Sequence, residues 1–500
     1  MSADTGPTRF APSSASWLWI HDARVPALVA LTAAAALLRF LSLRTQSYWY
    51  DEAITVELLR RPFREMLGAL PRSESTPPLY YVLAWIWSRV FGTDETGLRS
   101  LSAVIGTLTV PATYAAAQAL VTRRSALFAA ALVAVSPFLV WYSQEARAYG
   151  LLVLLGALTL VPLRRAVRPG AGRPLAAWAI VAGLALTTHY FALFLVAAEA
   201  IWLLRHSLEK RAAGIAVAAV AAVAVALAPL AAYQARSSQH TAWISNSGGV
   251  GSRTEYLLHQ LVVGVYPASH IRPLIAALPV LVLVGLFAWT QRAERAGGLV
   301  ALWFGLAAIG APAVLALVGD NLFGGRGDYF IYRNLIVATV PLTIAAAAVI
   351  GAQRTGRLGA VVVVVTCVLL SAVSVEIAQR PDLQKPDVRG VAKALGAPRT
   401  ARAIVVDART ATPLNLYLGH AVVAAEGNVS IRELDLILEP GSSIVRSFPR
   451  GFHRLVTRRV QTFTIVRLRA QRSLSVRVST LRKELATSGG AAVLLALRRP

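Results

Sequence analysis

Two acidic residues, Asp51 and Glu52, stand side by side directly after an apolar run over 26–43 that is about long enough to cross a lipid bilayer. A carboxylate at the edge of a membrane is costly to place, which makes it a candidate functional group. We expect Asp51 to remove a proton from an incoming hydroxyl group. The alternative is a structural role, in which a carboxylate near the N-terminus of a helix over 53–59 is stabilised by the helix dipole. This alternative fits Glu52 and Glu57 better than Asp51.

A second polar segment, 143–149, separates two apolar stretches and contains Gln144, Glu145, Arg147 and Tyr149. Glu145 and Tyr149 are four positions apart, so they share one face if this segment is helical. The segment is therefore a candidate partner of the first acidic pair. The alternative is a hairpin turn at the membrane edge whose charged side chains are only solvated.

Two further polar positions are the turn with His189 and Tyr190, and the basic residue Arg333. Both fall at predicted outer ends of apolar runs. Basic residues are disfavoured on the outer side of a membrane protein, so Arg333 requires a reason to be there. Binding a phosphate is one such reason, and anchoring to lipid headgroups is the alternative. For His189 the alternative is a purely structural role.

The sequence holds little that would bind a metal ion. No paired histidines and no repeated His/carboxylate spacing occur, and the single cysteine, Cys367, lies in an apolar run where we expect it to pack. Asp51, Glu52 and Glu145 could gather a hard divalent cation such as Mg²⁺ or Mn²⁺ through oxygen ligands. The sequence does not require such a cofactor.

The composition is typical of an integral membrane protein. Of 500 residues, 56% are hydrophobic and 15% are charged, whereas a soluble chain carries roughly a quarter charged residues. The net charge of +25 is carried almost entirely by arginines. These arginines cluster at the ends of apolar runs, where they orient membrane spans, and we do not expect nucleic-acid binding.

Apolar runs predict about eleven spanning helices, with the Arg-rich connections in the cytoplasm. The predicted spans cover 26–43, 99–121, 126–141, 151–163, 176–188, 191–204, 213–230, 273–290, 299–318, 335–350 and 358–375. The run 79–91 is shorter than the ~20 residues a span needs and is rich in aromatic residues such as Tyr80, so we expect it to lie flat in the interface within the first outer loop. Only then do Asp51, Glu145, His189 and Arg333 collect on the outer side.

The two ends of the chain differ from the middle. Residues 1–16 are predicted to be a disordered tail, 17–379 an all-α membrane domain, and 380–500 a small mixed α/β domain outside the membrane. Pro381 and Pro386 break the last helix. Strand patterns occur at 403–407, 421–425, 459–469 and 474–478. We expect no independent active site in this C-terminal domain.

Taken together, these motifs resemble bacterial relatives of the protein O-mannosyltransferases, which are GT-C membrane glycosyltransferases of glycosyltransferase family 39 with a dolichyl-phosphate-mannose-mannosyltransferase-like domain. The segments that carry the resemblance are 48–52, 76–81, 98–103, 137–149, 188–190 and 384–390. Two positions depart from the family pattern: Thr76 stands where His is common, and Val388 stands where Trp is common. These departures bear on acceptor choice more than on the class.

The resemblance implies a polyprenyl-phosphate-linked sugar as donor, an active site facing away from the cytoplasm of a bacterial plasma membrane, and inversion at the anomeric carbon. It maps the catalytic base onto Asp51, with Glu52 beside it, and the second acidic motif onto Glu145. The acceptor would be a hydroxyl group of a cell-envelope glycan, lipid or protein. The side chains expected to bind substrate are Tyr50, Tyr80, Gln144, Arg147, Tyr149, His189, Tyr190 and Arg333.

In this chemistry the lipid phosphate leaves without a general acid, unlike the alkoxide of a glycoside. Its charge would be stabilised by Arg333, Arg147, His189 or a bound cation. A polyprenyl-linked lipid transporter or flippase is an alternative, but it would place charges near the membrane midplane, where only Glu199 falls. A non-catalytic membrane scaffold would not need the acidic motifs.

Overall fold

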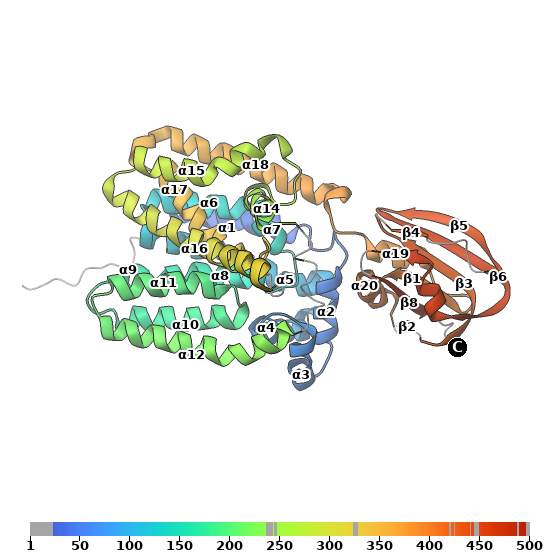
Figure 1. Ribbon diagram of the computed structural model, residues 1–500. Helices are drawn as coiled ribbons and strands as arrows, with labels where there is room; N and C mark the ends of the chain where they lie inside the picture. Colours follow the sequence, from blue (N-terminus) through green and yellow to red (C-terminus); the bar gives the residue numbers. More distant parts are fainter. Residues whose placement is uncertain are drawn as a thin grey trace, which may run out of the picture.

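The computed structural model describes residues 24–236, 244, 248–323, 329–419, 422–424, 426–440, 442–444, 450–487 and 490–496. The predicted disordered tail, 1–16, lies outside these described residues. Figure 1 shows a helical region with a sheet attached at one end.

Through residue 379 the described chain is helical (Figure 1). Its helices are α1 (Arg24–Phe40), α2 (Tyr50–Leu59), α3 (Phe63–Ser73), α4 (Leu79–Phe91), α5 (Glu95–Leu120), α6 (Arg123–Val135), α7 (Pro137–Tyr142), α8 (Tyr149–Leu160), α9 (Leu163–Ala166), α10 (Gly172–Thr188), α11 (Ala192–His206), α12 (Lys210–Ala235), α14 (Val250–Val263), α15 (Arg272–Ala288), α16 (Arg292–Phe323), α17 (Thr339–Ile350) and α18 (Gly356–Gln379).

Every predicted span range contains a helix, and the helical fold is confirmed. Within the described residues, 6 helices are long and apolar enough to cross a membrane: Glu95–Leu120, Tyr149–Ala166, Lys210–Ala235, Ser269–Ala288, Glu294–Gly319 and Gln353–Gln379. The count of about eleven spans stays a prediction. α4 has the predicted bounds, and its flat orientation in the interface stays a prediction as well.

The predicted span 126–141 is two helices, and the prediction of one continuous helix there is wrong. α6 ends at Val135 and α7 begins at Pro137. Proline has no backbone N–H to donate, and its fixed φ suits the first position of a helix. The Ser136 hydroxyl accepts a hydrogen bond from the Leu139 N–H at 3.4 Å and so caps α7. The break directs the chain from α6 into the second polar segment.

α2 begins at Tyr50, three positions before the predicted helix, so Asp51 and Glu52 lie in its first turn. The N-cap residue is Trp49, and no side chain caps this end. Glu52 therefore lies near the helix N-terminus as predicted, whereas the predicted placement of Glu57 there is wrong. Glu52 is turned toward α5, and Glu57 is exposed beyond the first turn.

The C-terminal part is a mixed α/β unit, as predicted. Its sheet has the strand order β2-β8-β1-β3-β6-β5, in which β1 and β3 are parallel and the other pairs are antiparallel. The elements are α19 (Val388–Leu395), β1 (Arg402–Asp407), α20 (Ala408–Leu418), β2 (Val422–Ala424), β3 (Asn428–Leu438), β4 (Ser443–Ile444), β5 (Phe452–Val460), β6 (Phe463–Arg477), α21 (Val478–Arg482), β7 (Leu485–Ala486) and β8 (Ala491–Ala496).

Two strand predictions need correction. The range 459–469 is not one strand, because Val460 and Phe463 face each other across a turn that joins β5 to β6. β3 was not predicted, although it pairs with both β1 and β6. Its first five residues alternate between exposed and buried, but the alternation ends at Glu433, which interrupts the pattern of a half-buried strand.

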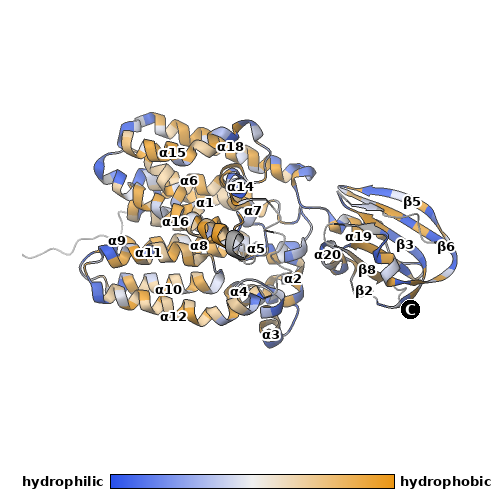
Figure 2. Cartoon of the chain, viewed as in Figure 1, coloured by the Kyte–Doolittle hydropathy of each residue, from blue (hydrophilic) through white to orange (hydrophobic). Residues whose placement is uncertain are grey.

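Polar connections gather at the two ends of the helical region (Figure 2). Figure 1 places α9 and the connection between α11 and α12 at the end far from the sheet. The first of these carries the exposed Arg164 and Arg165. α2 and the exit from α18 lie at the end near the sheet. Exposed arginines also follow α2, at Arg60 and Arg61, so the one-sided distribution of arginines stays a prediction.

Candidate active site

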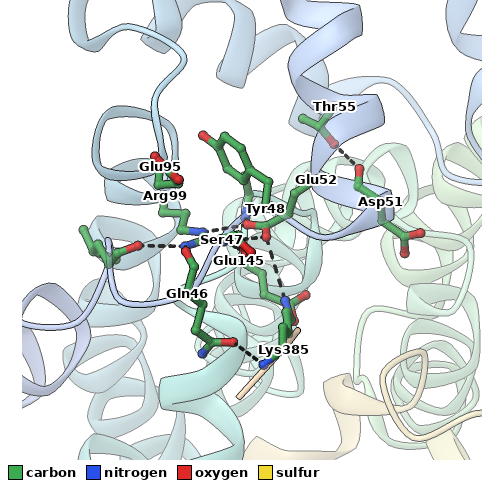
Figure 3. A network of polar contacts seen from close by, with 12 residues as sticks. Gln46, Ser47, Tyr48, Asp51, Glu52, Thr55, Glu95, Arg99, Glu145 and Lys385 are labelled. Atoms are coloured by element: carbon green, nitrogen blue, oxygen red, sulfur yellow. Dashed lines mark hydrogen bonds and ion pairs between the residues drawn. The ribbon is translucent and has the colours of Figure 1, made fainter. Parts of the chain in front are cut away.

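A buried ion pair fixes the first acidic motif on α5. Arg99 donates from Nε to Glu52 Oε1 at 2.8 Å and from Nη2 to Oε2 at 2.6 Å. Its Nη1 also donates to the backbone carbonyls of Leu43 and Gln46, both at 2.8 Å. Arg99 is 2% exposed and Glu52 is 0% exposed. One guanidinium therefore holds both α2 and the loop before it (Figure 3).

Glu52 is charged in this setting. Burial alone would raise the pKa of its carboxyl, but the charges of Arg99 and Lys385 and two sets of hydrogen bonds outweigh burial and hold that pKa below its usual range. One of these hydrogen bonds comes from the Ala146 N–H at 2.9 Å, so Glu52 also fixes the second polar segment. Both oxygens of Glu52 are thus occupied by protein donors.

Asp51 has different surroundings from its neighbour. Figure 3 shows its carboxylate pointing away from the Glu52–Arg99 pair. Its Oδ2 lies 3.4 Å from Arg333 Nη1, and the two side chains are 20% and 16% exposed. The Arg333 guanidinium also lies over the Trp49 ring, 5.4 Å from its centroid. Because both side chains are partly exposed, a substrate can reach the carboxylate and the guanidinium together.

Arg147 is held by a residue that the sequence did not indicate. It donates from Nη1 and Nη2 to the two oxygens of Glu74 at 2.6 and 2.9 Å. Its Nη1 also contacts Thr55 Oγ1 at 3.2 Å and the Asp51 carbonyl at 3.4 Å. Both partners of this pair are buried. The positive charge of Arg147 is therefore already compensated by Glu74. Arg147 also holds α2 through its contacts with Thr55 and the Asp51 carbonyl.

Glu145 pairs with Lys385, which lies in the segment that follows α18. Lys385 Nζ lies 2.6 Å from Glu145 Oε1, which also accepts from Trp141 Nε1 at 3.0 Å. The same ammonium is 3.9 Å from Glu52 and lies over the Trp49 ring at 4.6 Å. Two signals could have found Lys385: lysines occur only at 210, 385, 393 and 483, and this one falls within the motif 384–390.

His189 is buried and uncharged. Burial, with smaller contributions from the charges of Arg147 and Arg333, lowers the pKa of its imidazole to about 3. Its Nδ1 accepts from the Phe191 N–H at 3.2 Å, which leaves the proton on Nε2. Its ring lies 6.0 Å from that of Tyr149. At neutral pH His189 can offer a hydrogen bond to a phosphate but no positive charge.

The remaining predicted residues lie around this centre in other contacts. Tyr50 is half-buried beside Asp51, and burial, together with the Asp51 charge, raises the pKa of its phenol. Tyr190 donates to Gln234 Oε1 at 2.7 Å, and Tyr80 is buried in α4. Gln144 donates to Ser42 Oγ at 2.7 Å at the end of α1, where it lines a cavity of about 280 Å³.

The three acidic residues do not form a metal site. Among the residues that the structure describes, no group of three or more His, Cys, Asp or Glu side chains could hold a metal ion. Glu52 and Glu145 bind Arg99 and Lys385 instead. The described residues therefore do not form the three-carboxylate site for a divalent cation that the sequence left open.

Part of the chain matches a known family. Residues 75–233 match the family model described as dolichyl-phosphate-mannose-protein mannosyltransferase. No curated protein sequence matches the chain.

Several solved structures are similar at low identity. ArnT from Cupriavidus metallidurans in the apo state has 14% identity and a TM-score of 0.43, over 89% of this chain and 98% of that chain. The S. cerevisiae protein O-mannosyltransferase Pmt1-Pmt2 complex bound to the sugar donor has 18% identity and a TM-score of 0.32, over 44% of this chain and 33% of that chain. The archaeal oligosaccharyltransferase AglB from Archaeoglobus fulgidus has 13% identity and a TM-score of 0.40, over 74% of this chain and 57% of that chain. The match thus spans about a third of the yeast chain and just over half of the archaeal one.

Proposed function

We propose that the chain is a GT-C membrane glycosyltransferase, because residues 75–233 match the mannosyltransferase family model, and that it transfers a sugar from a polyprenyl-phosphate donor to a hydroxyl group of a cell-envelope acceptor. The observation that carries the proposal is the pair Asp51 and Arg333. Their side chains lie 3.4 Å apart and are both partly exposed. A base next to an anion-binding group is what attack by a hydroxyl on a phosphate-linked sugar needs.

In the proposed reaction, Asp51 takes the proton of the acceptor hydroxyl while the hydroxyl oxygen attacks the anomeric carbon. The bond between that carbon and the phosphate oxygen breaks, and the electron pair leaves with the phosphate. Arg333 stabilises the phosphate charge. A phosphate leaves without protonation, so no general acid is required. Attack from the face opposite the leaving group inverts the anomeric carbon.

Other residues have supporting roles in this proposal. Glu52 and Glu145 were expected among the catalytic groups, and both are held by cations. We assign them to positioning Asp51 and the second polar segment. Arg147 holds α2 through Thr55 and the Asp51 carbonyl, and it pairs with Glu74 after α3. His189 offers its Nε2–H to the donor phosphate. Tyr50, Tyr149, Tyr190, Tyr80 and Gln144 remain the proposed substrate-binding side chains.

The placement of the chain in the membrane belongs to the same proposal. Residues 17–379 form the catalytic membrane domain with about eleven spans. Residues 380–500 form a domain outside the cytoplasm of a bacterial plasma membrane, on the same side as Asp51. The supporting observation is that α2 and the sheet lie at one end of the helical region, and the Arg-rich α9 lies at the other (Figure 1).

The enzyme proposal has more support than transport by a flippase. The charged pairs of the site lie at helix ends and in connections, whereas a transporter places them near the midplane on broken helices. Glu199 is buried within α11, where it accepts from Thr159 Oγ1 and Trp178 Nε1, each at 2.8 Å. These neutral donors satisfy Glu199, and within the described part of the chain its ion-pair partners include no arginine or lysine.

The proposal is tested with purified protein and a panel of polyprenyl-phosphate-linked sugars, namely mannose, arabinose, glucose and an amino sugar. Release of polyprenyl phosphate and formation of a glycosylated acceptor are measured. We expect Asp51→Asn to lower the rate by about 10²–10⁴-fold, the usual contribution of a general base. The matched control is Glu57→Gln, an exposed carboxylate on the same helix, which should keep the wild-type rate. Full transfer by Asp51→Asn would contradict the base assignment.

A further inference from the structure

The site contains matched charges. Four of its buried or partly buried cations each pair with a carboxylate: Arg99 with Glu52, Arg147 with Glu74, Arg333 with Asp51, and Lys385 with Glu145. The first three cations come from the helical region before α18. Lys385 alone comes from the segment that links α18 to the sheet. Lys385 takes no part in the reaction steps proposed for Asp51 and Arg333.

Lys385 contacts both acidic motifs. Its ammonium is 2.6 Å from Glu145 and 3.9 Å from Glu52, whose side chains are 4% and 0% exposed. A buried carboxylate that loses its cation is strongly disfavoured. Glu52 keeps Arg99 when Lys385 is removed, but Glu145 keeps only the neutral Trp141 Nε1–H. Its second oxygen is buried with no hydrogen-bond partner among the described residues. Glu145 therefore depends on Lys385.

The segment around Lys385 also holds the loop that leads into α2. The Lys385 N–H donates to Gln46 Oε1 at 3.1 Å. Ser47 Oγ donates to the Pro386 carbonyl at 3.0 Å and accepts from the Val388 N–H at 3.0 Å. Figure 3 shows Gln46 and Lys385 side by side below Glu52. The main chain of this linking segment is thus fixed to the residues directly before Asp51.

α20 holds the same loop from the sheet side. The Tyr48 N–H donates to Tyr417 Oη at 2.7 Å, and the Tyr417 hydroxyl in turn donates to Glu95 at 2.7 Å. Arg389 forms an ion pair with Glu95 at 2.9 Å. The loop over 46–48 therefore lies between the start of α5 and the C-terminal region, with contacts to both.

We propose that Lys385 is a positioning residue of the transfer reaction. It acts through Glu145 and Glu52, and its segment holds the loop over 46–48 and thereby Asp51 in place. This inference rests on the proposed function and deepens it. The link between α18 and the sheet then forms part of the active site, although it lies outside the part of the chain that matches the family model.

A different role for Lys385 would be direct contact with the donor phosphate. Its ammonium and the Arg333 guanidinium lie over the same Trp49 ring, at 4.6 and 5.4 Å from the centroid. The two roles differ in what they change. Loss of a phosphate contact weakens donor binding, whereas loss of a positioning group slows turnover of bound donor. The double variant with Glu145→Gln separates them further, because removing both partners of a buried pair is far milder than removing one.

The experiment compares Lys385→Met with Lys393→Met, a matched control at an exposed lysine on α19. We expect Lys385→Met to lower kcat by about 10–100-fold, the effect of a misplaced reacting group, while KM for the donor changes by less than about twofold. Amide hydrogen exchange over 44–52 should become faster in Lys385→Met and stay at the wild-type rate in Lys393→Met. Adding Glu145→Gln to Lys385→Met should restore kcat at least about threefold.

Two results would overturn the inference. One is an unchanged kcat and unchanged exchange over 44–52 in Lys385→Met. The other is a raised donor KM that Glu145→Gln does not correct, which would make Lys385 a donor-binding residue. If the wild-type protein transfers no sugar from any donor in the panel, the proposed function fails, and the exchange measurement still decides whether Lys385 holds the loop.

Discussion

Asp51 and Glu52 are neighbours in sequence, but they have separate surroundings because successive residues of a helix point about 100° apart. Glu52 faces α5 and is buried against Arg99, whereas Asp51 faces Arg333 and solvent. A carboxylate whose oxygens both accept from a guanidinium is a poor base, since its pKa is held low. The ion-pair partner and the exposed fraction of each carboxylate therefore distinguish two side chains of nearly the same chemistry.

The pH dependence of stability gives a test at this scale through His189. Burial lowers the pKa of its imidazole to about 3 in the folded protein, against about 6.5 in an unfolded chain. Between these values the unfolded state binds a proton that the folded state does not, so stability falls as the pH falls below about 6.5. His189→Gln removes this loss. We expect the Tm of the wild type to drop relative to that of the variant between pH 7 and pH 5.

Thermal unfolding in detergent across this pH range provides the measurement. The control is His206→Gln, because His206 is exposed at the end of α11. Its Tm should follow that of the wild type at every pH. Parallel Tm curves for the wild type and His189→Gln would show that His189 is not held neutral in the folded protein.

Helix packing behind the site depends on a close approach at Gly106 of α5. A Cβ atom there would lie 2.6 Å from Ser143 Cβ and 3.1 Å from Arg39 Nε. Arg39 is buried and donates to Ser143 Oγ at 3.2 Å and to the Ala134 carbonyl at 2.8 Å. α1, α6 and the second polar segment thus meet α5 at a position where only glycine fits.

We therefore expect Gly106→Ala to destabilise the protein by about 1–3 kcal/mol, the usual cost of overpacking. The matched control is Gly183→Ala in α10, where the nearest atom to a new Cβ is a Val223 methyl at 3.7 Å. That change should be neutral or slightly stabilising, because alanine is the better helix former. Thermal unfolding of both variants measures the difference. Equal Tm values would mean that α5 can shift away from Ser143 at little cost.

Helices that follow from an apolar composition could be predicted from the sequence. Elements whose start, end or burial depends on the segments packed against them could not. The apolar runs indicated helices because a bilayer-length run of alanine, valine and leucine has few other stable states. The break at Pro137 was missed, although proline is a known helix breaker, because the run remains apolar through it. α14 was not predicted, since its sequence is mixed and its buried side depends on what packs against it.

The same distinction applies to the site. The acidic motifs, His189 and Arg333 were found because charged residues next to apolar runs are conspicuous. Their partners were not found, because an ion pair such as Arg99–Glu52 joins positions 47 apart in sequence. Glu74 lies in an ordinary polar connection, and Lys385 lies 240 positions from Glu145. Residue type and spacing suggest the chemistry, but long-range packing decides which charges remain available.

At the scale of the whole molecule, the C-terminal region and the helical region meet at the site itself. The rings of Tyr48 and Tyr417 stack with centroids 6.5 Å apart, and Arg389 joins Glu95 at the start of α5. These contacts place the sheet at the end of the helical region where Asp51 lies (Figure 1). In the proposed orientation, the sheet and the site lie on one face of the bilayer, and the Arg-rich connections lie on the other.

This orientation predicts on which side of the membrane two exposed arginines lie. Arg64 in α3 precedes α4, and Arg123 begins α6. If α4 lies flat, a single span, α5, separates them, so they lie on opposite sides. If α4 crosses the membrane, two spans separate them, and they lie on the same side. The single cysteine of the chain, Cys367, can first be replaced by alanine to give a cysteine-free background.

In that background we expect Arg64→Cys to react with a membrane-impermeant maleimide in intact cells, and Arg123→Cys to react only after permeabilisation. Basic residues favour the cytoplasmic side, and Arg123 and Arg124 stand together at the start of α6, so this outcome agrees with the usual charge asymmetry. Labelling of both cysteines after permeabilisation controls for their accessibility. Labelling of both in intact cells would make α4 a span and would move the second polar segment, and Glu145 with it, to the side opposite Asp51. That result would also contradict the proposed site, in which Lys385 lies 2.6 Å from Glu145 and 3.9 Å from Glu52.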